Sequence, residues 1–410
     1  MNLPDSNTKH LLHRSFSCPD SLEVGDSDCT YMSSLQLTMT SKPKGLLERL
    51  ADGPIVGDGS MLWTLEKRGY VTAGSWTPEA VVQYPDAVRQ LHREFLRAGA
   101  DVLQTFTFFA SEENLKYKGV GDTGDAAVSY DELNRRACEL AREVADEGDA
   151  LVAGSLSPVT IYKDGVGKER VQEAFKKQLD IFQEKGVDFL LGEFFGYVEE
   201  AEWAVEVMVS SGLPVACMMK MTVNGDTSGV KPDEVAVRLA RAGADVIGVN
   251  CCFDPSTALE TIALMKEGLE RAGLKKHLMA QPLGYHTQEI KYDPIGYSNL
   301  PEFPFAMEPR ALTRIDARQF ARRAYELGVS YIGGCCGFEP YHIRAIAEEL
   351  TGERGRPIPG ADKSYPDYSG LKKCFYENQR ARANQEYWNK LVPAVGRKKI
   401  QMMADINQNH

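Results

Sequence analysis

Four cysteines occur as two adjacent pairs, each directly after a short apolar segment of the chain. Cys251 and Cys252 end the segment GVNCC, and Cys335 and Cys336 lie between glycines in GGCCG. Thiolates are soft ligands that favour zinc, and three thiolates with one open position are typical of a catalytic zinc site rather than a structural one. The sequence therefore predicts one zinc ion per subunit, bound by Cys251, Cys335 and Cys336.

Other interpretations of these thiols stay open. Neighbouring side chains of a strand point to opposite faces, so adjacent cysteines share a metal only where the strand breaks, and flanking glycines provide that freedom. Cys252 is expected to point away from the metal unless the turn rotates it. The thiols could instead be core residues or form a strained disulfide between neighbours. The cysteines expected to pack or stay inert are Cys138, Cys217 and Cys374.

A zinc ion held by three thiolates suits one kind of chemistry. The metal keeps a bound substrate thiol deprotonated at neutral pH, while the charge of the ligands keeps its sulfur reactive as a nucleophile. The cysteine pattern thus predicts alkyl transfer to a thiol.

The elements that must position the cysteines alternate between strand and helix. Helices that end in glycine run directly into strands at Arg97–Val102 and Arg241–Val246, with related junctions at Glu184–Phe189 and Glu326–Tyr331. Repeats of this unit build a parallel sheet through right-handed crossovers. Amphipathic helices are expected between the strands, for example at 85–99, 131–147, 171–186, 199–212 and 256–273.

Eight strands follow from this pattern and predict a (β/α)8 barrel over residues 44–352. A doubly wound open sheet is the alternative, but GDGS at 57–60 is too short for the phosphate loop of that fold. Functional groups of a barrel lie at the C-terminal ends of its strands, where both cysteine pairs fall. The expected strands are 54–59, 101–108, 150–156, 187–195, 214–220, 245–251, 277–284 and 330–337.

The regions outside the barrel differ in composition. Residues 1–43 are rich in Ser, Thr and Asp and are expected to be disordered. Within them, Ser17 fits a motif for a phospho-dependent adaptor protein, although an unstructured tail explains the same residues. Residues 353–410 form a Pro/Gly-rich linker and a tail whose basic, aromatic helix at 372–391 is expected to contact a partner subunit. The Pro- and Tyr-rich segment 286–310 is expected to form a lid or an oligomer loop.

Composition narrows the class of protein. The formal net charge is −11 over 410 residues, and no basic stripe is present, which disfavours nucleic acids and anionic membranes as partners. No apolar run approaches a membrane span, and the N-terminus lacks the apolar core of a secretory signal. Nine cysteines without such a signal indicate a reducing compartment, so a cytoplasmic location is expected.

Several segments together resemble the zinc-dependent homocysteine methyltransferases, most closely their betaine-using members. The segments are GVNC, GGCCGFEPYHIRAIAEEL, DGSMLWTLEKRGY, WTPEA, QTFTF and ADEGDALVAG. The resemblance covers about residues 44–352 and is weaker in the tail. It implies zinc on three cysteines, L-homocysteine as the nucleophile, and methyl transfer from an onium donor to give methionine. The betaine-using members are homotetramers with dimer contacts in the tail, so a dimer or tetramer is implied here.

The resemblance also assigns roles to individual residues. Cys251, Cys335 and Cys336 match the zinc ligands. Glu193 matches the carboxylate that binds the homocysteine ammonium, and Asp58 with Gly59 matches the segment that holds the same amino-acid head. Thr105 is expected near the substrate carboxylate. The expected substrate-binding residues are thus Gly59, Thr105, Trp76, Phe109, Phe194 and Asn250, with Glu193 and Asp58 as catalytic residues.

The aromatic cage for the methyl donor departs from the family pattern. Ring faces attract an onium cation, and Trp76 matches the cage tryptophan. Phe109 and Phe194 stand where betaine-using enzymes have tyrosine, and Cys252 stands where mammalian-like members have histidine. Loss of a phenol that hydrogen-bonds the betaine carboxylate costs about 1–3 kcal/mol.

Two alternatives to betaine methylation follow from this departure. In one, the donor is a sulfonium compound, such as dimethylsulfoniopropionate, a thetin or S-methylmethionine. In the other, the barrel is catalytically weak and acts as a zinc- and ligand-binding regulatory protein. In either enzymatic case the expected mechanism is direct displacement at the methyl carbon, and no motif requires a nucleotide, flavin or folate.

Overall fold

The computed structural model describes residues 44–74, 76–117, 128–364 and 369–391. The region 1–43, with the candidate phosphoserine Ser17, lies outside the described residues. Eight parallel strands form one sheet in the order β1-β8-β7-β6-β5-β4-β3-β2. The strands are β1 (Ile55–Val56), β2 (Val102–Gln104), β3 (Leu151–Leu156), β4 (Phe189–Phe195), β5 (Val215–Met219), β6 (Val246–Asn250), β7 (His277–Gln281) and β8 (Val329–Ile332).

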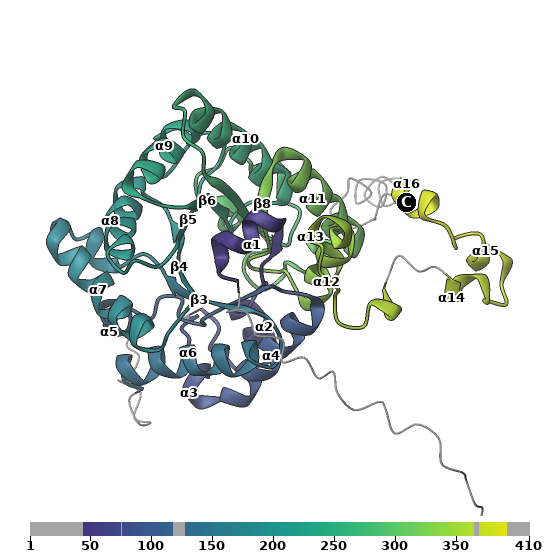
Figure 1. Cartoon of the computed structure of the whole chain (residues 1–410), viewed down its shortest axis with the longest axis horizontal. Coiled ribbons are helices and arrows are strands. Elements are labelled where there is room, and N and C mark those ends of the chain that lie inside the picture. Colours follow the sequence, from purple (N-terminus) through teal and green to yellow (C-terminus); the bar gives the residue numbers. More distant parts are fainter. Residues whose placement is uncertain (1–43, 75, 118–127, 365–368, 392–410) are drawn as a thin grey trace, which may run out of the picture. The chain divides into compact units, whose positions relative to one another are not determined.

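Helices surround this sheet and confirm the predicted (β/α)8 barrel (Figure 1). The sheet closes between β1 and β2, where the Asp101 N–H donates to the Val56 carbonyl oxygen at 2.7 Å and the Val56 N–H donates to Asp101 Oδ2 at 2.8 Å. The surrounding helices are α4 (Pro85–Ala98), α6 (Tyr130–Ala145), α7 (Lys168–Glu184), α8 (Val198–Val209), α9 (Pro232–Ala242), α10 (Pro255–Arg271), α11 (Arg314–Leu327) and α12 (Pro340–Glu349).

Shorter helices occupy the connections. α1 (Leu46–Asp52) packs Leu46 and Leu50 against the residues inside the barrel. The others are α2 (Leu62–Lys67), α3 (Ala80–Gln83), α5 (Glu112–Tyr117), α13 (Thr351–Arg354), α14 (Ser369–Lys372), α15 (Glu377–Arg380), α16 (Gln385–Lys390), and the 3-10 turns η1 (Thr160–Tyr162), η2 (Gln288–Ile290), η3 (Gly296–Asn299), η4 (Glu308–Arg310) and η5 (Ala361–Lys363).

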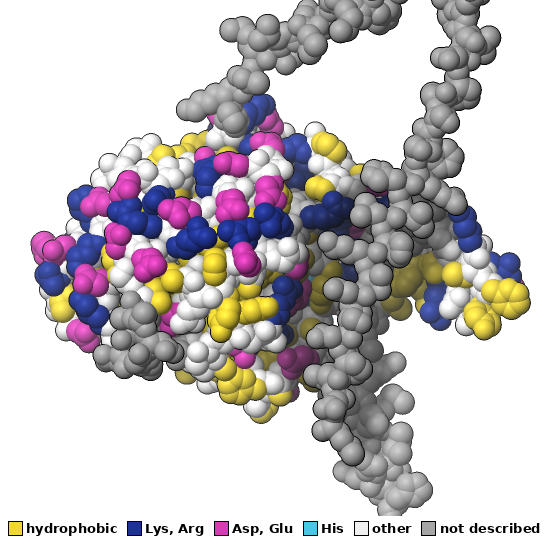
Figure 2. All heavy atoms as spheres, turned by 90° about the horizontal axis from the view of Figure 1, so that it is seen from below, with side chains coloured by type: hydrophobic (Ala, Val, Ile, Leu, Met, Phe, Trp, Pro, Cys, Tyr) yellow, Lys and Arg dark blue, Asp and Glu magenta, His cyan; other side chains and the backbone are white. Residues whose placement is uncertain are grey.

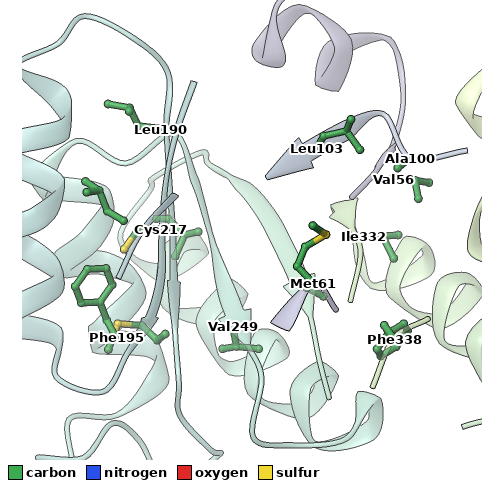
Figure 3. Close-up of a cluster of buried hydrophobic side chains, with 14 of the residues drawn as sticks. Val56, Met61, Ala100, Leu103, Leu190, Phe195, Cys217, Val249, Ile332 and Phe338 are labelled. Atoms are coloured by element: carbon green, nitrogen blue, oxygen red, sulfur yellow. The ribbon is translucent and has the colours of Figure 1, made fainter. Parts of the chain in front are cut away.

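Strand alternation divides the buried residues into two layers. Phe189 and Leu191 of β4 belong to the layer inside the barrel, whereas Leu190 belongs to the layer between strands and helices. Figure 3 shows part of the outer layer, with Leu190, Cys217 and Ile332 on three different strands. Cys217 and Cys138 are both buried there, so they pack as expected.

Two segments outside the barrel strands bear on function. The expected lid at 286–310 contains only the 3-10 turns η2, η3 and η4. The continuous tail helix expected at 372–391 is wrong, because α15 and α16 are separate helices. The Asn384 side chain accepts a hydrogen bond from the Tyr387 N–H at 2.7 Å and so begins a new helix instead of continuing the first.

The described surface carries both signs of charge. Figure 2 shows acidic and basic side chains interspersed over one face, without a large patch of one sign. Among the described residues, no helix combines the length and apolar character that crossing a membrane requires.

Candidate active site

A cavity of about 310 Å³ opens where the strands end at their C-terminal side. All of the predicted site residues except Asp58 line it. They come from five different strand ends or the loops that follow them, so the barrel brings together residues more than 250 positions apart in the chain. The predicted residues in the wall are Gly59, Trp76, Thr105, Phe109, Glu193, Phe194, Asn250, Cys251, Cys335 and Cys336.

Three of the four adjacent cysteines form a compact group. The Sγ atoms of Cys251, Cys335 and Cys336 all lie within 4.8 Å of one another. Cys251 is buried and the other two are half-buried at the cavity. A soft set of three thiols at this spacing, open on one side to a cavity, fits a zinc ion with a free coordination position.

The thiols perturb one another strongly. Hydrogen bonds from Cys252, Cys335 and Cys336 hold the pKa of Cys251 well below its usual range. The pKa values of Cys335 and Cys336 are raised, mainly because each thiol hydrogen-bonds the thiol of Cys251. Three thiols this close cannot all ionise without a cation, and a bound divalent ion would supply the missing positive charge.

Cys252 is not part of this group. It is buried beneath the loop that follows β7, where the Tyr297 N–H donates to its carbonyl oxygen at 3.1 Å. A Cβ atom at Gly296 would lie only 2.9 Å from Cys252 Cβ, so the loop packs directly against this cysteine. The Cys252 thiol lies outside the group of three, but it still hydrogen-bonds Cys251, so the expectation that it points away from all the metal ligands is wrong for Cys251.

The backbone at the site is strained. Among the described residues other than glycine, positive φ angles occur only at Trp76, Phe109, Phe194, Cys251 and Cys252, at 47° to 65°. Each is a predicted site residue or directly follows one. Left-handed backbone at non-glycine residues is costly and concentrates at functional sites. The turn that frees Cys251 is therefore made by the cysteines themselves, rather than by flanking glycines.

The glycines of GGCCG have steric roles. A Cβ atom at Gly334 would lie 2.1 Å from Phe338 Cγ. Gly337 has a φ angle of 84°, and a Cβ atom there would lie 2.5 Å from Tyr285 Cε2. These two positions let the chain after β8 pass closely between neighbouring aromatic rings.

Two carboxylates lie on the side of the cavity formed by β1 to β4. Glu193 Oε1 accepts a hydrogen bond from Ser155 Oγ at 2.6 Å, and burial raises the pKa of Glu193 to about 7. Asp58 lies behind the cavity wall, where its Oδ2 accepts the Gln104 N–H at 2.8 Å. Burial raises the pKa of Asp58 to about 8, and the Glu193 charge adds to that increase. Such a pair favours a cationic group nearby.

The hydroxyl of Thr105 is engaged within the protein. Its Oγ1 accepts the Ser155 N–H at 3.0 Å and lies 2.9 Å from Thr107 Oγ1. The Asn250 side chain is also engaged, because its Oδ1 accepts the Phe194 N–H at 2.9 Å. Both residues therefore shape the cavity through bonds to neighbouring strands as well as through their exposed surface.

Aromatic rings form the rest of the wall in two groups. Phe108 lies 4.2 Å from Phe109 and 5.5 Å from Phe194 between ring centroids. In the second group, Trp76 lies 6.3 Å from Trp63 and 6.0 Å from Phe303 between ring centroids. Two groups of rings in a cavity wall suit an onium cation, which is attracted to ring faces.

Sequence analysis missed several wall residues. Trp63 and Phe108 lie in the segments DGSMLWTLEKRGY and QTFTFF, whose aromatic content could have indicated them. Tyr297 and Phe303 belong to the loop after β7 and pack against each other at 5.0 Å. Only the folded path of that loop brings them to the cavity. The wall residues that were not predicted include Trp63, Gln104, Phe106, Phe108, Gln281, Tyr297 and Phe303.

Bonds within the loop at 286–310 and bonds to the barrel hold this loop, and one of the latter is the Tyr297 N–H donating to the Cys252 carbonyl oxygen at 3.1 Å. Arg310 Nη1 donates to the His286 carbonyl oxygen at 3.1 Å, and its Nη2 donates to Glu302 at 3.1 Å. Lys67 Nζ donates to the Tyr285 hydroxyl at 2.9 Å, just before the loop begins. Since Tyr297 and Phe303 line the cavity, these bonds help to hold the aromatic wall in place.

Comparison with known proteins agrees with this geometry. The homocysteine S-methyltransferase family matches residues 55–350. Betaine--homocysteine S-methyltransferase 1 from Xenopus tropicalis is 56% identical over 359 residues, which cover 87% of this chain and 88% of that protein. S-methylmethionine--homocysteine S-methyltransferase BHMT2 from Pongo abelii is 55% identical over 355 residues, which cover 86% of this chain and 94% of that protein.

A solved structure resembles the fold at lower identity. The metallated form of the homocysteine methyltransferase MmuM from Escherichia coli has a TM-score of 0.55 and 20% sequence identity, and the match covers 72% of this chain and 95% of that one. At this identity the likeness supports the barrel fold alone.

Proposed function

The chain belongs to the homocysteine S-methyltransferase family, and we propose that it methylates zinc-activated L-homocysteine from a betaine-like onium donor, giving methionine. The observation that supports this proposal most directly is that a group of three cysteines lines the same cavity as the aromatic rings. Thiols bind the metal that activates a sulfur nucleophile, and aromatic rings bind a methylated cation. The relatives that match 86–87% of the chain are named as enzymes, and this argues against the non-catalytic alternative.

Each group of the cavity has a part in the proposed reaction. Cys251, Cys335 and Cys336 would hold the zinc ion, which supplies the positive charge that keeps a substrate thiol ionised at neutral pH. Glu193, supported by Asp58 behind the wall, would bind the homocysteine ammonium. This places the substrate head near β4 and directs its sulfur toward the cysteine group.

The methyl donor would occupy the aromatic part of the cavity. Trp76, Phe109 and Phe194 present rings that attract the onium group and orient its methyl carbon. The homocysteine sulfur attacks that carbon, the carbon–nitrogen bond breaks, and nitrogen leaves with the electron pair as a neutral tertiary amine. The loop at 286–310 excludes water, so catalysis depends on positioning and on a dry site.

A sulfonium donor is the second candidate, because a sulfonium carbon is a better methyl source than a quaternary ammonium and needs less of the stabilisation that phenols at 109 and 194 would give. Neither Phe109 nor Phe194 carries the hydroxyl that would hydrogen-bond the carboxylate of betaine. The two relatives that differ in their named donor are 56% and 55% identical to this chain, so overall similarity does not separate betaine from S-methylmethionine.

A donor panel tests the proposal directly. Purified protein is loaded with zinc and given homocysteine with betaine, dimethylsulfoniopropionate or S-methylmethionine, and methionine is quantified. We expect methionine from at least one donor, and kcat/KM ranks the donors. Stoichiometric zinc without turnover on any donor would contradict the enzymatic proposal. Betaine as the fastest donor would exclude the preference for a sulfonium compound.

We also propose a cytoplasmic homo-oligomer. All seven cysteines in the described part of the chain are unpaired, which suits a reducing compartment. In the tail, Phe375 is 91% exposed and Tyr376 is 63% exposed, and exposed rings of this kind are typical of subunit contacts. The Ser17 adaptor motif stays a prediction, because it lies outside the described residues.

A further inference from the structure

The described residues that line the aromatic cavity provide no cationic group. Among the described residues that line it, none is lysine, arginine or histidine. A betaine-like donor carries a carboxylate as well as an onium group, and a carboxylate that leaves water needs a cation or a hydrogen-bond donor. With phenylalanine at 109 and 194, the cage offers no phenol at either position for that purpose.

Lys220 is a cation directly beside the cage. It follows β5, and its N–H donates to the Phe195 carbonyl oxygen at 2.8 Å, which fixes its backbone next to Phe194. Its Nζ atom lies 5.5 Å from the centroid of the Phe194 ring. The side chain is half-buried and does not itself line the cavity, so its ammonium lies against a ring whose surface forms the wall.

The charge of Lys220 is not neutralised by a protein partner. In the described part of the chain, no carboxylate forms an ion pair with its ammonium and no acceptor binds it. Two other lysines lie over aromatic rings but have such partners. Lys67 donates to the Tyr285 hydroxyl, and Lys291 donates to Glu260 at 3.3 Å. Lys220 differs from both in keeping its charge available beside the cavity.

On the basis of the proposed function, we infer that Lys220 pairs with the carboxylate of the methyl donor. The flexible four-carbon stem lets the ammonium reach around the edge of the Phe194 ring. Its charge also weakens the attraction of the Phe194 ring for an onium group, so the rings of Trp76 and Phe109 would take the larger part in binding that group. The donor would therefore place its onium end toward Trp76 and its carboxylate toward Lys220. The site would therefore select zwitterionic donors. The pairing of Lys220 with the carboxylate would replace the contact that phenols make in related enzymes.

Binding measurements isolate the carboxylate. Betaine and tetramethylammonium share a quaternary nitrogen, but only betaine carries a carboxylate, and both can be titrated against tryptophan fluorescence or by calorimetry. We expect Lys220→Met to weaken betaine binding by about tenfold or more while leaving tetramethylammonium binding unchanged or tighter. Lys220→Arg should restore much of the betaine affinity. Lys176→Met, at an exposed lysine of α7 that pairs with Asp180, is the control, and it should bind both ligands like the wild type.

Kinetics provide the second measurement. In Lys220→Met we expect the KM of the best zwitterionic donor in the panel to rise about tenfold or more, with little change in kcat or in the KM for homocysteine. Equal losses for betaine and tetramethylammonium, a raised KM for homocysteine, or a loss of zinc would overturn the inference and assign Lys220 to the cysteine group or to the cavity wall. Unchanged donor constants would overturn it as well. Failure of the proposed function differs, since wild-type protein would then form no methionine.

Discussion

At five positions of the site, the backbone adopts a conformation that side chains usually avoid. Trp76, Phe109, Phe194, Cys251 and Cys252 have positive φ angles, and each such residue costs about 1–3 kcal/mol. Such geometry persists only where surrounding packing enforces it. Three of these residues carry cage rings, and a fourth carries a metal-binding thiol. The strain therefore directs the side chains on which the proposed chemistry depends.

Loss of one thiol tests the proposed metal site. We expect Cys335→Ser to lose stoichiometric zinc and to lower kcat/KM by more than about 100-fold. Substituting a residue that only supports a metal ligand already lowers metal affinity or activity by about 10–100-fold. Metal analysis and the methionine assay measure the two effects. Cys374→Ser, in the tail, should retain both zinc and activity. Full zinc content in Cys335→Ser would contradict the assignment of this ligand.

The carboxylates predict a pH dependence of substrate binding. A carboxylate attracts the substrate ammonium only when ionised, and burial raises the pKa of Glu193 to about 7 and that of Asp58 to about 8. The affinity for the substrate should therefore fall as the pH decreases below about 8. The decrease should reach about tenfold per pH unit for each proton that the two carboxyl groups take up.

Binding of the product methionine measures this effect. Methionine has no thiol, so no titration of the ligand sulfur adds to the pH dependence. Its binding, followed by tryptophan fluorescence from pH 6 to 8.5, should tighten as the pH rises. In Glu193→Gln, binding should be weak and should lose much of this dependence. A wild-type affinity that is flat over this range would show that the two carboxylates are not linked to binding of the ammonium.

Restoring a phenol tests the role of the cage in donor choice. Phe109 is half-buried in the cavity wall, so Phe109→Tyr adds a hydroxyl where a donor carboxylate can accept a hydrogen bond. We expect the KM for betaine to fall by about tenfold, with a smaller change for trimethylsulfonium, which has no carboxylate. Equal changes for both donors would mean that the hydroxyl acts on the cavity in general.

At the scale of elements, the loop after β7 completes the site. It contributes Tyr297 and Phe303 to the cavity wall. Just beyond the loop, Nε2 of His342 in α12 lies 2.7 Å from the Leu312 carbonyl oxygen. Three short 3-10 turns give this loop little regular hydrogen bonding of its own. Its position therefore depends on side-chain anchors from both ends of the segment.

Removing one anchor should loosen the loop without unfolding the barrel. Arg310 bonds the His286 carbonyl oxygen, Glu289 and Glu302. In Arg310→Met we expect faster hydrogen exchange over 286–310, a kcat/KM several-fold to tenfold lower, and a Tm within a few degrees of the wild type. Arg170→Met, on the exposed side of α7, is the control. Unchanged exchange would show that Arg310 does not hold the loop.

At the scale of the whole molecule, the tail is the part that lacks a core. Phe375 and Tyr376, between α14 and α15, and Tyr387 of α16 are exposed, whereas the barrel helices bury their apolar faces. Helices of this length are unstable in isolation, and exposed rings are typical of subunit contacts, so the tail is the segment where we expect the proposed oligomer contact.

Polar substitution of the tail rings tests this contact. We expect Phe375→Ser/Tyr376→Ser to form a smaller oligomer than the wild type in light scattering after gel filtration, because the exposed apolar area is lost. Tyr325→Ser, at an exposed ring of α11 outside the tail and outside the loop at 286–310, should leave the assembly unchanged. An unaltered molar mass in the double variant would exclude these rings from the oligomer interface.

The sequence by itself determined the barrel and much of its catalytic apparatus. Helix–glycine–strand junctions repeat locally, so eight strands and the strand ends that carry Cys251 and Cys335 could be located from pattern alone. Thiol chemistry then indicated a soft metal, and the family motifs indicated Glu193 and Trp76. These inferences need only residue type, local period and the rule that parallel strands end on one face.

The tertiary structure decided which side chains meet. It excluded Cys252 from the thiol group, placed Asp58 behind the wall, and brought Tyr297 to the cavity. It also set Lys220 beside Phe194. These outcomes depend on left-handed turns and on a long loop whose path is set by contacts between distant segments. Local sequence patterns do not encode such contacts, because the packing that enforces them exists only in the folded chain.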